Sequence, residues 1–125
     1  MVESRKTQQQ IDDRDSHHIV IVPKIVLGKW LKELKEWIPT IRVLCFYGNA
    51  EERDIQKETI RNRKYDVMVT TFETVMKEKH ELQKHKFDLL ILDEAQRIKN
   101  DESVLSQILR KFRTFHRILL TGTPL

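Results

Sequence analysis

Short apolar runs alternate along the chain with longer segments in which apolar residues recur at helical spacing. The runs are rich in β-branched residues and have the length of strands, whereas the longer segments carry an apolar stripe. We predict strands at 18–23, 41–48, 66–71, 87–93 and 116–122. Strands and helices that alternate with short connections predict a three-layer α/β domain, with helices on both faces of a mainly parallel sheet.

Helices are expected in the segments between the strands. The first has an apolar stripe formed by Leu27, Trp30, Leu31, Leu34, Trp37 and Ile38. Asn49 can cap the second, with Glu52 as reciprocal partner, and this helix should lie mostly in solvent because it has few apolar residues. A third is expected at 72–79, followed by a charged turn or short helix. Asn100 can cap the last helix, whose stripe is Val104, Leu105, Ile108, Leu109 and Phe112.

Composition narrows the classes of protein to which the chain can belong. Its 125 residues are enough for one domain with a core, and no apolar run approaches the roughly 20 residues that cross a bilayer, so no membrane partner is expected. The net charge of +4 permits contact with nucleic acid without requiring it. The single cysteine, Cys45, fits a buried thiol in a reducing compartment, the cytosol or nucleus. Residues 1–18 predict a flexible polar tail ahead of a domain at 19–125.

Polar side chains stand where four of the predicted strands end. They are Lys24 after the first strand, Thr70 and Thr71 at the third, Asp93 and Glu94 at the fourth, and Thr121 and Thr123 at the fifth. In open parallel sheets, binding and catalytic groups gather beyond the carboxyl ends of the strands. We therefore expect a functional site at this rim of the sheet.

The stretch LLILDEAQ places two carboxylates directly after four apolar residues. Asp93 at the tip of a buried strand can hold Mg²⁺, and Glu94 can take a proton from an attacking water. Two adjacent carboxylates repel each other, so they need a cation or wide exposure to solvent. The alternative is that both residues begin an ordinary surface loop.

The stretch LLTGTP also follows an apolar run. The hydroxyl groups of Thr121 and Thr123 can bind a phosphate, a water or the neighbouring carboxylates. The alternative is a tight turn, because Gly122 and Pro124 are good turn residues. Taken alone, this stretch favours the turn.

The segment TTFE, residues 70–73, has two compatible interpretations. Thr70 can cap a helix with Glu73 as the reciprocal partner, which is the ordinary interpretation. The hydroxyls and main-chain amides can also contact a nucleic-acid backbone. Lys24, after Pro23, can likewise meet a phosphate, although exposed lysines are common and the signal is weak.

Four segments together carry a family resemblance. They are IVIVPKIVLGKWLKELKEWIP, DVMVTTFETVMKEK, LLILDEAQRIKN and RILLTGTPL. In order and spacing they resemble the first ATPase lobe of SNF2-type chromatin remodellers, with most similarity to the imitation-switch (ISWI) branch. The resemblance covers about residues 18–125. It implies a RecA-like lobe of the P-loop NTPase type, one half of a motor that uses ATP and Mg²⁺ to move along duplex DNA in nucleosomes in the nucleus.

The resemblance also implies roles for individual residues. Asp93 is similar to the family's Mg²⁺-binding acid and Glu94 to its general base. Two segments are similar to those with which the family contacts the DNA backbone. They are Pro23 and Lys24, and the run Thr70, Thr71, Phe72 and Glu73. Thr121, Gly122 and Thr123 resemble the segment that couples the state of ATP to DNA. Gln96 stands where the family's motif has histidine, so we expect altered coupling between ATP and DNA rather than loss of the metal.

Two features of the family are missing from this sequence. No G-x-x-x-x-G-K-[ST] phosphate loop occurs, since the only glycines are Gly28, Gly48 and Gly122. The second ATPase lobe, which supplies arginines to the nucleotide, has no counterpart either. We therefore expect an incomplete lobe with weak or absent ATP binding and no hydrolysis by this chain alone. Without the strand of the phosphate loop, residues 116–121 should form an unpaired apolar edge.

Three hypotheses stay open at this point. The first is a piece of an SNF2-type ATPase that is inactive alone. The second is a non-catalytic module, derived from the same lobe, that binds DNA or a protein partner. The third is an unrelated α/β domain in which the acid pair is incidental, and the order of the four segments argues against it.

Overall fold

The computed structural model describes residues 16–93 and 99–120, with side chains described for 16–93 and 104–120. The polar segment predicted at 1–18 therefore lies outside the described residues, apart from 16–18. Five residues singled out by the sequence also lie outside them: Glu94, Gln96, Thr121, Gly122 and Thr123.

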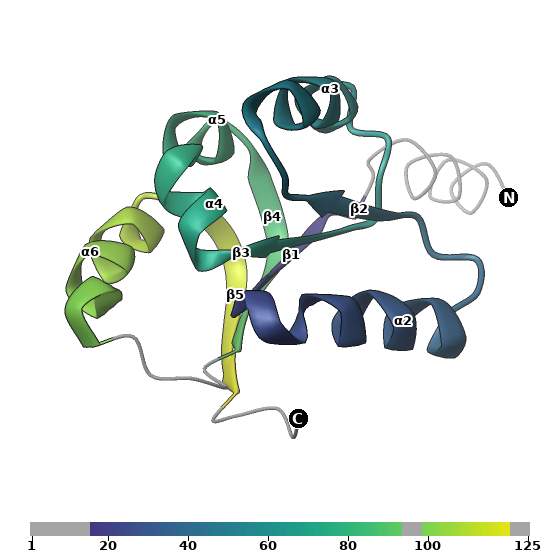
Figure 1. Cartoon of the computed structure of the whole chain (residues 1–125), viewed down its shortest axis with the longest axis horizontal. Coiled ribbons are helices and arrows are strands. Elements are labelled where there is room, and N and C mark those ends of the chain that lie inside the picture. Colours follow the sequence, from purple (N-terminus) through teal and green to yellow (C-terminus); the bar gives the residue numbers. More distant parts are fainter. Residues whose placement is uncertain (1–15, 94–98, 121–125) are drawn as a thin grey trace, which may run out of the picture.

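Strands and helices alternate as the sequence predicts (Figure 1). The strands are β1 (His18–Val22), β2 (Val43–Phe46), β3 (Val67–Thr71), β4 (Lys86–Asp93) and β5 (Arg113–Leu120). The helices are a short 3₁₀ helix, η1 (Lys24–Val26), followed by α2 (Leu27–Trp37), α3 (Ala50–Arg61), α4 (Phe72–Lys77), α5 (Lys79–Gln83) and α6 (Lys99–Arg110). The strands form one parallel sheet in the order β2-β3-β1-β4-β5, which confirms the predicted parallel α/β fold.

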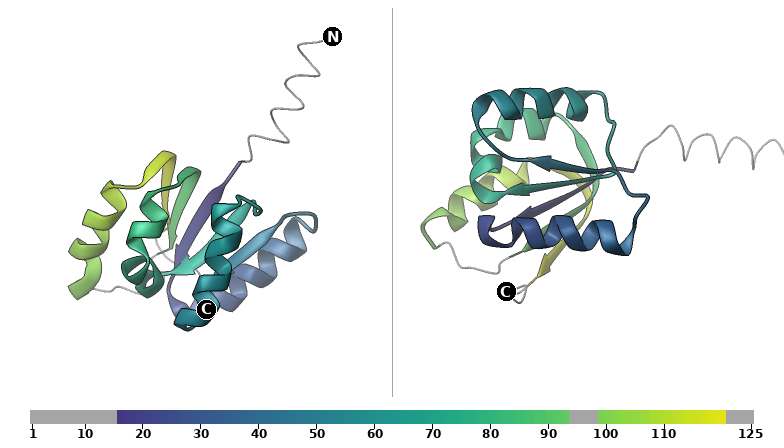
Figure 2. Two further views of the ribbon diagram at one scale, coloured as in Figure 1. Left: turned by 90° about the horizontal axis from the view of Figure 1, so that it is seen from above. Right: turned by 45° about the vertical axis from the view of Figure 1, so that its right-hand side comes forward.

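Helices cover both faces of the sheet (Figures 1 and 2). Successive side chains of a strand point to opposite faces, so the central strand β1 serves two cores. Ile19 and Ile21 enter the larger core, under α3, α4, α5 and α6, while Val20 and Val22 enter the smaller core, under α2. Residues 19–22 are all buried, which explains the continuous apolar run in this strand. None of the described helices is long and apolar enough to cross a membrane.

The predicted apolar stripes are correct except at three positions. In α2, Leu27 is buried and Trp30, Leu31 and Leu34 pack on the smaller core. Trp37 and Ile38 are 78% and 46% exposed, so the stripe prediction is wrong for these two residues, which lie at the end of α2 and just after it. In α6, Val104 is also exposed. Asn100 lies inside α6, which already includes Lys99, and so the predicted cap is wrong.

The predicted capping box of α3 is confirmed. Asn49 Oδ1 accepts a 2.8 Å hydrogen bond from Glu52 N, and Glu52 Oε1 accepts one of 2.8 Å from Asn49 N. Gly48 precedes the cap with a φ of +123°, where a Cβ atom would come within 2.3 Å of Glu52 Oε1. A glycine is therefore required for the chain to enter the capping box from β2.

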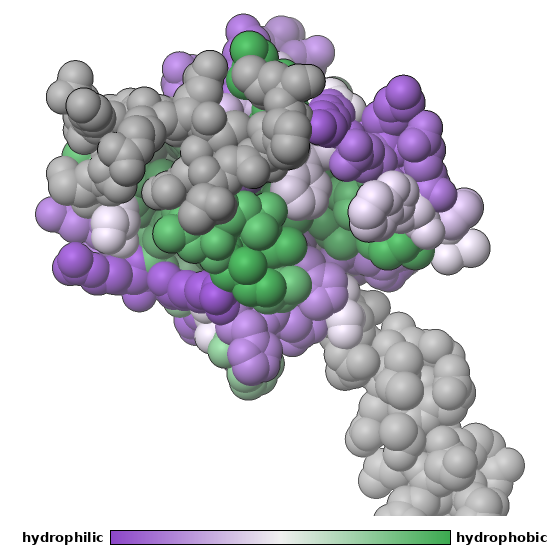
Figure 3. All heavy atoms as spheres, turned by 90° about the horizontal axis from the view of Figure 1, so that it is seen from below, coloured by the Kyte–Doolittle hydropathy of each residue, from purple (hydrophilic) through white to green (hydrophobic). Residues whose placement is uncertain are grey.

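The strand β5 lies at an edge of the sheet, as expected for 116–121, although Thr121 itself lies outside the described residues. Its only neighbour among the described strands is β4, and three large apolar side chains of β5 are exposed: Phe115 (72%), Ile118 (45%) and Leu119 (56%). The underside of the domain carries a contiguous apolar area (Figure 3). An apolar edge strand of this kind is a place where a further strand can pair.

Candidate functional site at the carboxyl rim of the sheet

The register of the strands brings the predicted site segments to one rim. Val22, the last residue of β1, pairs with Thr71 of β3, and Asp93 of β4 pairs with Leu120 of β5. Lys24, Thr71 and Asp93 therefore belong to the same end of the sheet. Residues 121–123 follow Leu120 directly in sequence but lie outside the described residues, as do Glu94 and Gln96.

Asp93 is fully buried at the carboxyl tip of β4. Its Oδ2 atom accepts a 2.8 Å hydrogen bond from the indole Nε1–H of Trp30, on the first turns of α2. The sequence pattern placed Trp30 only in the apolar stripe, and this polar role was missed. Only a general rule pointed to it: an indole N–H that is removed from water needs a hydrogen-bond acceptor. Such an acceptor was available because α2 follows β1 at the same end of the sheet where β4 ends.

The environment of Asp93 fits a Mg²⁺ ligand of the kind found in phosphoryl-transfer sites. Mg²⁺ is usually held by one or two carboxylates together with phosphate oxygens and water, rather than by a cage of protein ligands. Asp93 is one such carboxylate, on a rigid strand at the rim where ligands bind in parallel sheets. Among the described residues no group of three or more potential metal ligands comes together.

The segment after β1 exposes one cation. Pro23 is buried and precedes η1, where its carbonyl oxygen accepts a 3.1 Å hydrogen bond from Val26 N. Lys24 is exposed on η1. Of the two residues predicted to contact a nucleic-acid backbone here, only Lys24 presents a charged group to solvent.

The threonines that end β3 use their hydroxyl groups inside the fold. Thr70 Oγ1 donates a 2.8 Å hydrogen bond to Phe46 O of β2, in a fully buried position. Thr71 Oγ1 accepts a 3.2 Å hydrogen bond from Thr74 N and lies 2.9 Å from Thr74 Oγ1. The helix cap is therefore Thr71, and the prediction that Thr70 caps α4 with Glu73 is wrong by one residue.

This arrangement bears on the predicted nucleic-acid contact at 70–73. Thr70, Thr71 and Phe72 are buried, and both threonine hydroxyls already have partners. Glu73 is exposed, but its carboxylate has the same sign of charge as a phosphate. The structure thus favours the capping interpretation for these side chains, and contact of this segment with DNA stays a prediction.

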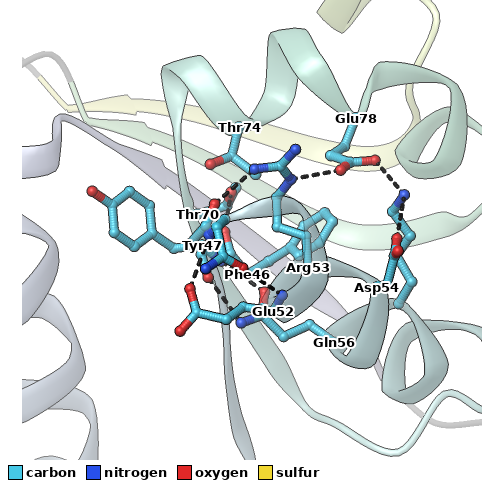
Figure 4. A network of polar contacts seen from close by, with 12 residues as sticks. Phe46, Tyr47, Glu52, Arg53, Asp54, Gln56, Thr70, Thr74 and Glu78 are labelled. Atoms are coloured by element: carbon cyan, nitrogen blue, oxygen red, sulfur yellow. Dashed lines mark hydrogen bonds and ion pairs between the residues drawn. The ribbon is translucent and has the colours of Figure 1, made fainter.

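A polar network holds the turn that follows β2, beside the rim (Figure 4). The Gln56 side chain bonds both the N–H and the carbonyl of Tyr47, at 2.9 and 2.8 Å. Arg53 Nη1 donates to Gly48 O at 2.7 Å, and its Nε donates to Glu78 Oε2 at 2.6 Å. Arg53 therefore ties the turn at the end of β2 to the end of α4.

Two buried glutamates anchor the exposed helix α3. Burial alone would raise the pKa of Glu78, but hydrogen bonds from Lys57 and Arg53 outweigh it and lower that pKa. Burial likewise opposes ionisation of Glu81, and hydrogen bonds from Arg61 and His85 outweigh it, lowering the pKa of Glu81 to about 2. The sequence pattern predicted that α3 lies mostly in solvent. Periodicity along α3 does not show that buried glutamates elsewhere in the fold pair with its basic side chains.

Comparisons with known proteins agree with this geometry. The family model described as "SNF2-related domain" matches residues 1–125. The SWI/SNF-related matrix-associated actin-dependent regulator of chromatin subfamily A member 1 of Mus musculus is 46% identical over 112 residues, which cover 86% of this chain and 10% of the mouse protein. The ISWI chromatin-remodeling complex ATPase ISW2 of Saccharomyces cerevisiae is 42% identical over 108 residues, with the same coverage.

A solved structure shows the same fold. It is the Sulfolobus solfataricus SWI2/SNF2 ATPase core in complex with dsDNA, with a TM-score of 0.71 at 28% identity, over 94% of this chain and 24% of that chain. The chain spans about a tenth of the length of the curated relatives that it matches. Its parallel sheet is thus RecA-like, and the chain belongs to the SNF2-related domain family.

Proposed function

We propose that this chain supplies the acidic half of an ATP-hydrolysis site in an SNF2-type chromatin-remodelling ATPase. The observation that carries the proposal is the position of Asp93, buried at the tip of β4 and in register with Leu120, the residue before the TGT segment. The carboxylate of Asp93 holds Mg²⁺, and that of Glu94 orients the attacking water and takes its proton. Bound Mg²⁺ offsets the charge of the phosphate oxygens.

The proposal includes a limit on activity. The 125 residues contain no G-x-x-x-x-G-K-[ST] phosphate loop, so the backbone amides and cations that bind the phosphates must come from elsewhere in the ATPase. ATP binding by the chain alone is therefore weak or absent. Gln96, neutral where the family's motif has histidine, changes the coupling between ATP and DNA, and Thr121, Gly122 and Thr123 take part in that coupling.

Duplex DNA in nucleosomes, within the nucleus, is the proposed partner of the assembled ATPase. The Sulfolobus solfataricus core was solved with dsDNA, and the yeast relative is named as the ATPase of a chromatin-remodeling complex. In this chain, Lys24 is an exposed cation at the rim, next to the end of β1. Pro23 and the segment 70–73 support the proposed contact through their backbone position, since their side chains are buried apart from Glu73.

A graft tests the catalytic part of the proposal. Residues 16–125 replace the matching segment of the mouse relative, so that its own phosphate loop and second lobe complete the site. We expect ATP hydrolysis that duplex DNA stimulates and that Glu94→Gln abolishes, whereas Glu36→Gln, at an exposed glutamate of α2, leaves it unchanged. A folded graft with no turnover, or with turnover that survives Glu94→Gln, would contradict the assignment.

The isolated chain gives the complementary result. ATP turnover should equal the background rate, with or without duplex DNA. Robust turnover of the isolated chain that Glu94→Gln removes would show that the chain has a phosphate site of its own, against the proposed limit.

A non-catalytic DNA-binding module is the second candidate function, favoured by the exposed Lys24 and the net positive charge. A salt titration of duplex-DNA affinity tests it with Lys24→Ala and, as control, Lys32→Ala on the exposed side of α2. Binding through phosphates weakens steeply as the salt concentration rises. Losing one phosphate contact lowers the slope of log affinity against log salt concentration by about 1. Affinity that is independent of salt, or equal slopes for the two variants, would contradict a phosphate contact at Lys24.

A further inference from the structure

The hydrogen bond between Trp30 of α2 and Asp93 of β4 joins two residues that are 63 apart in sequence. The indole has a single N–H donor and no acceptor, and this N–H donates to Asp93 Oδ2 at 2.8 Å. A carboxylate turns about its Cβ–Cγ bond unless something holds it. A donor fixed to one oxygen sets the plane of the group and the direction in which the other oxygen points.

The Trp30 ring is itself held in place. It packs against the smaller core, whose members Val20, Val22 and Val69 are buried on the central strands. The beginning of α2 is anchored by the buried side chains of Val26 and Leu27. The donor therefore stands on a rigid support, which is the requirement for orienting a ligand group.

We propose that Trp30 is a positioning residue that orients the Asp93 carboxylate for a divalent cation. The proposal rests on the proposed function in one respect, the assignment of Asp93 as the metal-binding acid. Trp30 does not touch the metal. It acts through Asp93, in the way that hydrogen-bond partners behind metal ligands usually do.

The hydrogen bond from Trp30 also connects Asp93, the proposed metal-binding acid, to the helix that follows Lys24. The helix α2 begins at Leu27, directly after η1, and Trp30 lies on its first turns.

A purely structural role is the competing explanation. In that case Asp93 serves only to satisfy the indole N–H in the core, and metal binding does not depend on Trp30. The two explanations differ in what Trp30→Phe does, since phenylalanine keeps most of the apolar packing and loses the donor. Trp37→Phe is the matched control, because Trp37 is 78% exposed.

The experiment uses NMR of the whole chain, with Mn²⁺ alone as the probe for the cation site. In the native chain we expect the Trp30 indole N–H to exchange slowly with solvent, unlike that of Trp37, and Mn²⁺ to broaden the backbone amide of Leu92. Trp30→Phe should weaken Mn²⁺ binding about 10- to 100-fold, the usual loss when a partner behind a metal ligand is removed. Trp37→Phe should leave it unchanged.

Asp93→Asn separates failure of the proposal from failure of the proposed function. The asparagine oxygen can still accept from Trp30, so slow indole exchange should persist while Mn²⁺ broadening disappears. If Asp93→Asn leaves the broadening intact, or the native chain shows none, the metal assignment fails and the positioning role falls with it. If the broadening depends on Asp93 but Trp30→Phe leaves it intact, only the positioning role is overturned.

A ring analogue keeps the test decisive if Trp30→Phe does not fold. In the Trp37→Phe background, 3-benzothienylalanine at position 30 keeps the shape of the indole and replaces the N–H by sulfur. Weaker Mn²⁺ binding in this folded chain supports the proposal, and unchanged binding overturns it.

Discussion

Asp93 and Leu120 are register partners at the carboxyl ends of β4 and β5. Each is followed in sequence by residues that the family resemblance marks as functional, Glu94 after the first and 121–123 after the second. Parallel strands that end in register deliver their next residues to the same rim. The register of β4 and β5 therefore predicts that Glu94 and residues 121–123, which lie outside the described residues, meet at this rim.

The ion pairs of Glu81 predict a loss of stability in acid. The pKa of Glu81 is about 2 in the fold and 4.5 ordinarily, so its contribution is complete above about pH 4.5 and disappears as the pH falls toward 2. Urea unfolding midpoints measured from pH 7 to pH 2 should fall across this window, and Glu81→Gln should flatten that fall. At pH 7 the variant should lose about 1.5–3 kcal/mol, the range for a hydrogen bond to a charged group. If the unfolding midpoints of the Glu81→Gln variant fall with pH as steeply as those of the native chain, Glu81 is not the source of the acid sensitivity.

Arg53 should matter more to stability than Arg61. Arg53 bonds both Gly48 O and Glu78 and its side chain is 15% exposed, whereas Arg61 bonds only Glu81 and is 54% exposed. Arg53→Ala removes a partner from buried Glu78 and should cost about 1.5–3 kcal/mol. Arg61→Ala should cost less, because the Arg61 side chain is half exposed and solvent screens its bond to Glu81. Chemical denaturation compares the two, and equal losses would show that the bond to Gly48 adds nothing.

Thr70 should behave as a structural residue. Thr70→Val keeps the shape of the side chain and loses the buried hydrogen bond to Phe46 O, so we expect a loss of about 1 kcal/mol in the free energy of unfolding. The affinity for duplex DNA and its salt dependence should stay as in the native chain, since the hydroxyl does not face solvent. A selective fall in DNA affinity with unchanged stability would instead support a direct contact by this threonine.

The edge strand β5 should make the isolated chain associate with itself. Phe115→Lys places a charge on the exposed edge and should lower concentration-dependent association in sedimentation. Ile55→Lys is the matched control, because Ile55 is 73% exposed but lies on α3, away from the edge. An equal effect of both substitutions would mean that association follows overall hydrophobicity rather than the edge.

Local patterns were enough to predict much of the fold. The β-branched run at 18–23 becomes a central strand because both of its faces are buried, and continuous burial leaves a continuous apolar pattern. The capping box of Asn49 and Glu52 was predictable because its partners are three residues apart. Such features depend only on neighbours in sequence.

Features that depend on which strands become neighbours could not be predicted in the same way. The bond from Trp30 to Asp93 exists because β1 pairs with β4, and spacing along the chain does not show this. The cap at Thr71 instead of Thr70 is a shift of one residue at an element boundary, where sequence patterns are least informative. Arg53 pairs with buried Glu78, between α4 and α5, and the solvated helix predicted from the sequence did not indicate this partner.

The meeting of the acid pair and the TGT segment at one rim is tested most directly by disulfide cross-linking. In a Cys45→Ala background, Glu94→Cys is combined with Thr121→Cys or, as control, with Asn49→Cys, three residues beyond the end of β2. Neighbouring parallel strands lie about 4.8 Å apart, within the span of a disulfide, whereas β4 and β2 are three strand spacings apart, about 14 Å.

We predict rapid intramolecular cross-linking of the 94–121 pair under mild oxidation, measured by mass spectrometry of the folded chain, and none for the 94–49 pair. A folded chain in which the 94–121 pair cross-links no faster than the 94–49 pair would contradict the central claim.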